Sequence, residues 1–274
     1  MLTTDLELPT DRRTLNAWAR SFYTFDPDIH RIINQHAFLL TKYYSLKPSE
    51  DISAHNLIEQ MLTDLHIKSL MEQMITEYFI IGEVFIYAEL DEAAGKWKRL
   101  ILQNPDYIVV RSNIMNDTQF YLRPDENLRR KVLSDKEEDI QACQKLSPSL
   151  VSHIKNGENI PLDNFHISHM MHKISPYEIR GTSFVCPLYR LLKKNERDQS
   201  DTQTIREALF DLHLLDSSIK KDVVYQRYIH IMHELEYLIN QKLIAPIARI
   251  NGFEHYPQVQ FNKSQLRKEL NKIK

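Results

Sequence analysis

Hydrophobic residues in the first third of the chain recur with the period of amphipathic helices. The first apolar face is made of Leu15, Trp18, Ala19, Phe22 and Tyr23. The second is made of Ile29, Ile32, Ile33, His36, Ala37 and Leu40. Asp11 and Asp26 stand where helix N-caps belong, and Pro27 takes the first helical position of the second segment. We expect this second helix to end at 47–49, with further helices over 53–65 and 69–80.

At Gly82 the hydrophobic period changes from that of a helix to that of a strand. Residues 83–90 and 96–103 predict two strands of a β-hairpin, joined by a turn at 91–95. A turn at Asn104–Asp106 leads to a third strand over 107–112, a fourth over 119–123 and a later one over 165–172. The charge-dense stretch 124–145 predicts a solvated helix, and a short helix follows between Ser147 and Gly157.

The last third of the chain is again helical in pattern. We expect one helix from Thr182 or Ser183 to about residue 194 and a short one over 204–215. A longer helix, which Pro246 ends, carries an apolar seam that consists of Val224, Tyr228, Ile231, Leu235 and Leu238. An edge strand over 258–261 and a basic tail follow. These elements predict an α+β fold that is rich in helices, with a small, mostly antiparallel sheet and long C-terminal helices.

Composition narrows the classes of function. The chain has 274 residues, of which 42% are hydrophobic, and its net charge is −2 from 35 basic and 37 acidic residues. No overall positive field would therefore draw it onto DNA. Residues 1–13 do not resemble a signal peptide, and no apolar run is long enough to span a membrane. Cys143 and Cys186 are expected to be free, reduced thiols.

Three histidines at 166, 169 and 172 raise the hypothesis of a metal site. In a strand, however, His166 and His172 share one face and His169 points to the other, whereas metal ligands must converge. We expect packing and hydrogen bonding for these three residues. A second group of possible metal ligands consists of His230, His233 and Glu234, and we expect it to be a surface patch. A metal-dependent enzyme that uses these histidines stays open as an alternative interpretation, and it predicts one bound metal ion per chain.

Glu77 and Glu83 flank the change of period at Gly82, and paired carboxylates are able to perform acid–base chemistry. Nothing nearby in sequence supplies a nucleophile or a basic partner, so we interpret the pair as a cap or an interface contact. The sequence contains no P-loop, nucleophile elbow or dinucleotide-binding fingerprint. We therefore expect no enzyme activity, no catalytic residue, no cofactor and no metal.

The segment Arg180–Ser183 combines a glycine with two helix-capping residues. Gly181 permits a left-handed turn, and Thr182 and Ser183 are able to cap a following helix. Alone, this is an ordinary transition from loop to helix. It gains weight from its place in an ordered series of stretches that share a pattern.

Five stretches, in this order, resemble the portal (head-to-tail connector) proteins of tailed bacteriophages, nearest to those of large contractile-tailed phages. They span residues 15–40, 75–110, 148–192, 225–253 and 256–266. The short motifs within them are Gly-Glu-Val-Phe at 82–85, Asn-Pro-Asp at 104–106, Arg-Gly-Thr-Ser at 180–183, Pro-Ile-Ala at 246–248 with Gly-Phe at 252–253, and Pro-x-Val-x-Phe-x-Lys at 257–263. Each motif is weak singly, whereas five in the right order are fairly specific. The resemblance covers about residues 11–192 and 222–266.

The resemblance implies a structural subunit of a homo-oligomeric ring, dodecameric in the family, at one capsid vertex. Double-stranded DNA would pass through it without sequence-specific binding, and the major capsid protein, the terminase and a tail or neck adaptor would be its partners. The location implied is the virion, and the host cytoplasm during assembly. Arg180, Gly181, Thr182 and Ser183 would form the junction between wing and stem. The seam from Val224 to Leu238 is expected to be core or, as the alternative, a contact between subunits.

One departure from the family pattern opens an alternative. The family inserts stem helices, a clip and a tunnel loop before the C-terminal helix, and here only residues 193–221 stand in that place. We therefore predict a wing-like α+β region over 1–181, a shortened stem-like region over 182–221, and a C-terminal helix with a basic tail over 222–274 that packs back on the wing. The alternative function is a portal-derived interaction module that forms no conduit.

Overall fold

Helices occupy most of the chain before the first hairpin. The computed structural model describes residues 11–112, 117–144, 146–173, 177–185 and 221–272. Its first helices are α1 (Arg12–Phe25), α2 (Pro27–Thr41), α3 (Ile52–Asp64) and α4 (Ile67–Ile81). The carboxylates of Asp11 and Asp26 accept hydrogen bonds from backbone N–H groups in the first turns of α1 and α2. Both predicted N-caps are therefore confirmed.

The second helix is shorter than predicted. It ends at Thr41, and Tyr44–Lys47 forms strand β1, which pairs antiparallel with β8 (Gln258–Phe261). Tyr44 and Leu46 alternate with exposed residues, as in a strand with one buried face. The prediction that this helix reaches 47–49 is wrong, because the pairing partner that makes these residues a strand lies more than 200 residues away.

The central sheet has the order β3-β2-β7 and contains the predicted hairpin. Its strands are β2 (Glu83–Asp91), β3 (Lys96–Gln103) and β7 (Ile167–Met171), and both pairings are antiparallel. A 3-10 turn, η1 (Pro105–Tyr107), leads into a second sheet with the order β4-β5-β6. Its strands are β4 (Ile108–Ser112), β5 (Thr118–Leu122) and β6 (Ile160–Leu162). The single predicted sheet is therefore divided, in the described residues, into these two and the pair β1-β8.

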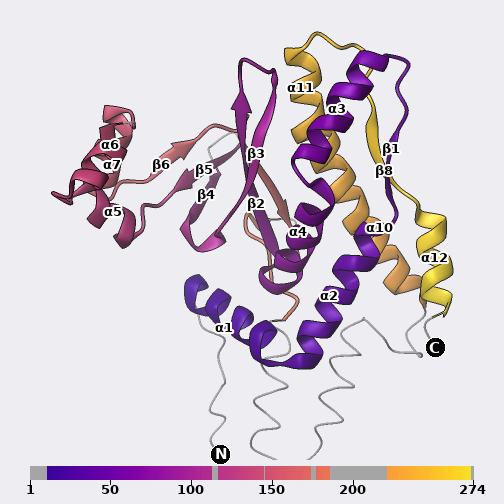
Figure 1. The fold of residues 1–274 in the computed structure, drawn as a ribbon. Coiled ribbons are helices and arrows are strands. Elements are labelled where there is room, and N and C mark those ends of the chain that lie inside the picture. Colours follow the sequence, from indigo (N-terminus) through magenta and orange to yellow (C-terminus); the bar gives the residue numbers. More distant parts are fainter. Residues whose placement is uncertain (1–10, 113–116, 145, 174–176, 186–220, 273–274) are drawn as a thin grey trace, which may run out of the picture.

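The charge-dense stretch forms two helices and not one. They are α5 (Glu126–Val132) and α6 (Glu137–Gln144), and α7 (Pro148–Asn156) follows at the predicted place. No residue of α6 is buried, which agrees with the predicted solvated face. Figure 1 shows these three helices as a lobe on one side of the central sheet, with α3, α4 and the C-terminal helices on the other. Beside that lobe, a small apolar cluster around Phe85 and Phe120 joins the two sheets.

The C-terminal helix continues past the predicted stop at Pro246. α10 (Lys221–Tyr237) leads into a π-helix, η2 (Leu238–Ile244), then α11 (Ala245–Ile250), with α12 (Lys263–Lys272) after β8. Pro246 lies in the first turn of α11, where the wide π-helical turns before it accommodate the missing N–H and the ring. The Trp97 indole N–H donates a hydrogen bond of 2.7 Å to the Leu243 carbonyl in this π-helix. The prediction that Pro246 ends the helix is wrong, because α11 continues to Ile250.

One large apolar core joins the helices to the central sheet. It contains Ile33 of α2, Met74 of α4, Ile86 of β2 and Leu235 of α10, all of them buried. Side chains from before residue 181 and after residue 222 therefore share one core. The predicted helix to residue 194 and the helix over 204–215 lie mainly or wholly outside the described residues. Mixed helices and small antiparallel sheets confirm the α+β class.

Candidate functional site: a buried ion network at Glu83

The site begins where α4 ends. Gly82 takes a left-handed conformation, with φ of 88°, and its N–H bonds to the Tyr78 carbonyl. This turn starts β2 at Glu83, whose side chain is fully buried. A buried carboxylate is costly unless charged groups and hydrogen-bond donors surround it. The surroundings of Glu83 are therefore the first place to look for a site.

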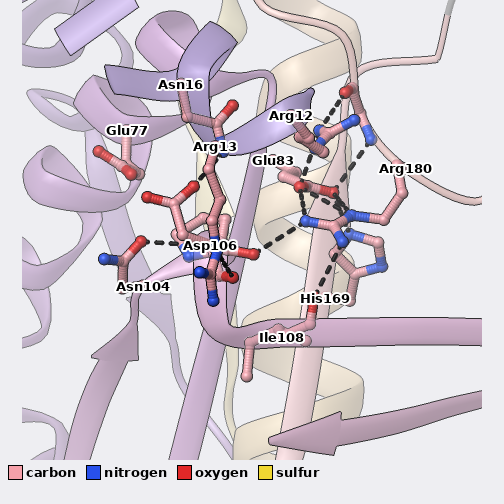
Figure 2. A network of polar contacts seen from close by, with 12 residues as sticks. Arg12, Arg13, Asn16, Glu77, Glu83, Asn104, Asp106, Ile108, His169 and Arg180 are labelled. Carbon is pink, nitrogen blue, oxygen red and sulfur yellow. Dashed lines mark hydrogen bonds and ion pairs between the residues drawn. The ribbon is translucent and has the colours of Figure 1, made fainter. Parts of the chain in front are cut away.

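Glu83 is surrounded by basic groups from three distant parts of the chain (Figure 2). The Arg180 Nε lies 2.9 and 3.0 Å from the two carboxylate oxygens, and the Arg12 Nη2 lies 2.8 Å from Oε1. The backbone N–H of Gly181 donates to Oε2 over 3.1 Å, and His169 Nε2 lies 3.4 Å from the same oxygen. Both carboxylate oxygens thus have partners on more than one side.

These contacts set the ionisation of the network. Burial alone would raise the pKa of Glu83, but hydrogen bonds from His169 and Arg180 and the charges of Arg180 and Arg12 outweigh it, so that the pKa is about 2. Burial lowers the pKa of His169, against the opposing effect of Glu83. At neutral pH, Glu83 is therefore an anion and His169 is neutral, with Nε2–H as the tautomer that donates to it.

Arg180 joins this network to the turn before β4. Its Nη2 donates to the Pro105 carbonyl over 3.0 Å and its Nη1 to the Ile108 carbonyl over 2.9 Å. The guanidinium also lies over the Phe85 ring, 5.5 Å from the centroid. A planar donor fork is suited to several acceptors at once, and a lysine would not reproduce this. The three motifs at 82–85, 104–106 and 180–183 therefore meet around one side chain.

Gly181 is needed for close approach and not for a left-handed turn. Positive φ occurs at Gly82, Gly95, Gly157 and Gly252, and not at Gly181, so the conformation predicted for Gly181 is wrong. A Cβ on Gly181 would lie 1.9 Å from the Gly82 carbonyl oxygen. The two glycine backbones pass each other at van der Waals contact, and neither position has room for a side chain.

Residues 182–184 are bonded to the end of α4 and to the residue after β7. The Thr182 N–H donates to the His172 carbonyl over 2.9 Å, and the Phe184 N–H donates to the Phe79 carbonyl over 3.2 Å. The Ser183 hydroxyl donates to the Ile80 carbonyl and accepts from the Val185 N–H. The last carbonyls of a helix have no partner within it, so this segment satisfies two of them. The helix that Thr182 or Ser183 was predicted to cap lies mainly outside the described residues.

The structure does not pair Glu77 with Glu83. Glu77 belongs to a second network, in which Arg20 bonds to Glu77 over 2.7 Å and to Asp106 over 2.8 Å. Asn16, which is buried, donates to Asp106 over 2.6 Å. Each carboxylate thus has its own arginine. The sequence interpretation found no basic partner near Glu83, because Arg180 follows it only after 97 residues.

The histidines have the separate roles that their spacing predicts. His166 bonds to the Ala88 carbonyl, His172 bonds to the Thr182 carbonyl, and His169 faces Glu83. His230 and His233 are exposed on α10, and His233 lies 3.3 Å from Glu236. Among the described residues, no group of three or more His, Cys, Asp or Glu side chains is arranged to hold a metal ion.

The seam of α10 faces the interior of this chain. Tyr228, Ile231, Leu235 and Leu238 are all buried in the large core, and the side chain of Val224 is outside the described residues. These side chains are therefore covered within the chain itself. The sequence interpretation missed Arg12 and Arg20 as members of these networks, because nothing local marks a charged side chain that binds a distant one.

Comparisons with known proteins give little beyond this. No protein-family model and no curated protein matches the sequence. Among solved structures, the chain is similar to one from the neck of a native GTA particle computed with C12 symmetry. The two share 10% sequence identity and a TM-score of 0.38, over 95% of this chain and 86% of the other. Nothing about function follows from so distant a likeness. Within the described residues, no helix has both the length and the apolarity to cross a membrane.

Proposed function

We propose that the chain is a structural subunit of a phage portal ring, with the Glu83 network at the junction between its wing, residues 1–181, and the shortened stem-like region that begins at residue 182. The ring would sit at one capsid vertex, admit double-stranded DNA, and contact the major capsid protein, the terminase and a tail or neck adaptor. These partners come from the sequence resemblance.

One observation carries the proposal. Three of the short portal-like motifs are separated by many residues, and Arg180 of one motif bonds directly to Glu83 and to the Pro105 carbonyl of the other two. Motifs that only happened to match a family pattern would have no reason to meet. Their meeting supports the interpretation that they belong to one architectural unit.

The chemistry of the network supports a structural role and not catalysis. Glu83 is fully buried, its pKa is held at about 2, and its oxygens already accept several hydrogen bonds. A general base needs a pKa near the working pH and access to a substrate proton. Glu83 has neither, so we propose that the chain is not an enzyme.

The charge of the chain suits a conduit. Each phosphate that a lysine or arginine neutralises adds salt-dependent affinity for DNA, and a pore that passes DNA must not retain it. A net charge of −2 is compatible with such a passage. Ring closure would be heterologous, so that one face of a subunit meets a different face of the next.

The test is the mass of the purified assembly, by native mass spectrometry with negative-stain images. We expect a closed ring of about twelve subunits with a central hole. Gly181→Val is expected to abolish the ring. Gly252→Val is expected to retain it, because a Cβ there meets no atom within 4 Å and the only cost is the local strain of a φ of 70°. A wild-type chain that stays a monomer or dimer at high concentration would overturn the portal function.

The monomer or dimer result would favour the alternative, a portal-derived interaction module that forms no conduit. The observation behind this alternative is the short stretch over 193–221, where the family carries its stem, clip and tunnel loop. Pull-down with the capsid protein would then separate an interaction module from an inactive remnant.

A further inference from the structure

An arginine-lined pocket lies against the outer side of the Glu83 network. It has a volume of about 270 Å³, between the start of α1 and the turn that leads into β4. Its charged lining consists of Arg12, Arg13, Arg123, Arg180, Asp11 and Asp106. Four guanidinium groups thus face one small space with two carboxylates.

The two aspartates are already engaged. Asp11 accepts hydrogen bonds from the Thr14 N–H over 2.9 Å and from the Thr14 hydroxyl over 2.8 Å, as the N-cap of α1. The Asp106 carboxylate accepts from Asn16 over 2.6 Å and from Arg20 over 2.8 Å. Asp11 still attracts the charge of the adjacent Arg13, whereas the Asp106 carboxylate is paired with Arg20. Two carboxylates, one of them shared with Arg20, are too few to neutralise the four arginines of the pocket together with Glu83.

The arginines differ in what they bind. Arg12 and Arg180 are bonded to Glu83. Arg13 donates its Nε–H to the Asp106 carbonyl and lies over the Tyr107 ring. Arg13 and Arg123 are both exposed, and in the part of the chain that the structure describes neither forms an ion pair with a carboxylate. Positive charge with unused N–H donors therefore remains at the mouth of the pocket.

We propose that this pocket binds an oxyanion with two or more oxygens, held at its mouth by Arg13 and Arg123. Planar guanidinium groups match the paired oxygens of a carboxylate or phosphate with parallel N–H···O bonds. A cation is excluded by the four arginines, and an apolar group would leave their donors unsatisfied. The oxyanion has two possible sources, which are a carboxylate side chain on a second copy of this chain and free inorganic phosphate.

The first source rests on the proposed ring, and the second does not. A carboxylate from the next subunit would make the pocket one half of a heterologous contact. Free phosphate would bind a monomer equally well. The two sources predict opposite responses of assembly to phosphate, because phosphate competes with the carboxylate in the first case only.

The experiment uses wild type, Arg123→Gln and the matched control Arg111→Gln. Arg111, in β4, is also an exposed arginine; it lies over the Tyr121 ring and does not line the pocket. Binding of inorganic phosphate is measured by isothermal titration at constant ionic strength, and assembly by native mass spectrometry with and without phosphate. Because a charged hydrogen bond is lost, Arg123→Gln is expected to weaken phosphate binding or assembly by about tenfold, and Arg111→Gln by less than about twofold.

Each outcome decides the proposal. If Arg123→Gln reduces assembly and phosphate dissociates the wild-type ring, the occupant is a carboxylate of a second copy. If Arg123→Gln reduces phosphate binding and assembly does not respond, the occupant is the free anion. If neither quantity changes in Arg123→Gln, or Arg111→Gln changes them equally, the pocket is not an oxyanion site. A protein that never assembles overturns the portal function, and the phosphate titration still decides the pocket.

Discussion

The start and the middle of the central strand β2 are held in different ways. Ile86 and Ala88 lie in the large apolar core, where α2, α4 and α10 pack through hydrocarbon and aromatic side chains. Glu83, at the start of the same strand, is held by the charged Arg12 of α1 and Arg180, and by N–H donors of His169 in β7 and of Gly181. An apolar core loses stability in proportion to what is removed. An ion network that loses one member leaves a buried charge without its partner, which costs far more than the contact is worth.

The largest effect is expected from Gly181→Ala. The added Cβ would lie 1.9 Å from the Gly82 carbonyl oxygen, and backbone at both positions would have to move. We expect a loss of more than about 4 kcal/mol in the free energy of unfolding, since backbone displacement also breaks the bonds to Glu83. Urea denaturation measures this loss.

The control is Gly252→Ala, where a Cβ meets no atom within 4 Å but φ is 70°. It is expected to lose about 1 kcal/mol from backbone strain alone. If the two variants were equally stable, close approach at Gly181 would not be what the site requires.

The next largest effect is expected from Arg180→Met, with a loss of about 3 kcal/mol in the free energy of unfolding. The fully buried Glu83 then keeps only Arg12, His169 and the Gly181 N–H as partners. Adding Glu83→Gln to Arg180→Met removes the uncompensated charge and should recover part of the loss in the same denaturation series.

Arg99→Met is the control, because Arg99 pairs with Glu89 at an exposed site, and it should cost less than about 1 kcal/mol. Equal losses in the two arginine variants would show that the network is no stronger than a surface pair.

This difference also explains what the sequence reveals. The helices of the apolar side follow from local spacing, since residues such as Ile29 and Ile33 repeat with the period of the helix they form. The N-caps Asp11 and Asp26 were equally local and were confirmed. The fold class could therefore be predicted from the pattern of single segments.

The Glu83 network depends on pairs of residues that are far apart in the chain. Arg180 and Glu83 are separated by 97 residues, and no pattern within either segment selects the other. The motif at 180–183 was found, but the reason given for Gly181 was wrong, because contact with Gly82 is set by the tertiary fold. Strand β1 was missed for the same reason, since its partner β8 lies at the other end of the chain.

Asn240→Leu tests a polar contact inside the apolar side. The Asn240 amide accepts from the Val259 N–H over 2.7 Å and donates to its carbonyl over 2.8 Å, so it holds β8 against the π-helix. Leucine has a similar size and would leave both buried backbone groups unpaired, which should cost about 2 kcal/mol. The neighbouring exposed Gln241→Leu should be neutral in thermal or urea denaturation. A neutral Asn240→Leu would mean that the pairing with β1 and the bond from the Phe261 N–H to Glu236 position β8 without Asn240.

The smallest effect, His36→Phe, depends on pH. His36 is buried beside Phe79 and Tyr228, and desolvation lowers its pKa from 6.5 to about 3. A histidine that the fold keeps neutral gives stability that is full above the unfolded pKa and is lost as pH falls toward the folded one. Between pH 7.5 and 5.5, the wild type should therefore lose about 1 kcal/mol in the free energy of unfolding through His36.

His36→Phe should lose that much less over the same interval. Its stability at pH 7.5 should stay close to wild type, because one buried, unbonded nitrogen is removed. His169 and His172, whose pKa values are also lowered, contribute equally to both proteins, so the difference between the two pH profiles isolates His36. Parallel profiles from urea denaturation would show that His36 is able to gain a proton without cost, and hence that water reaches this part of the apolar core.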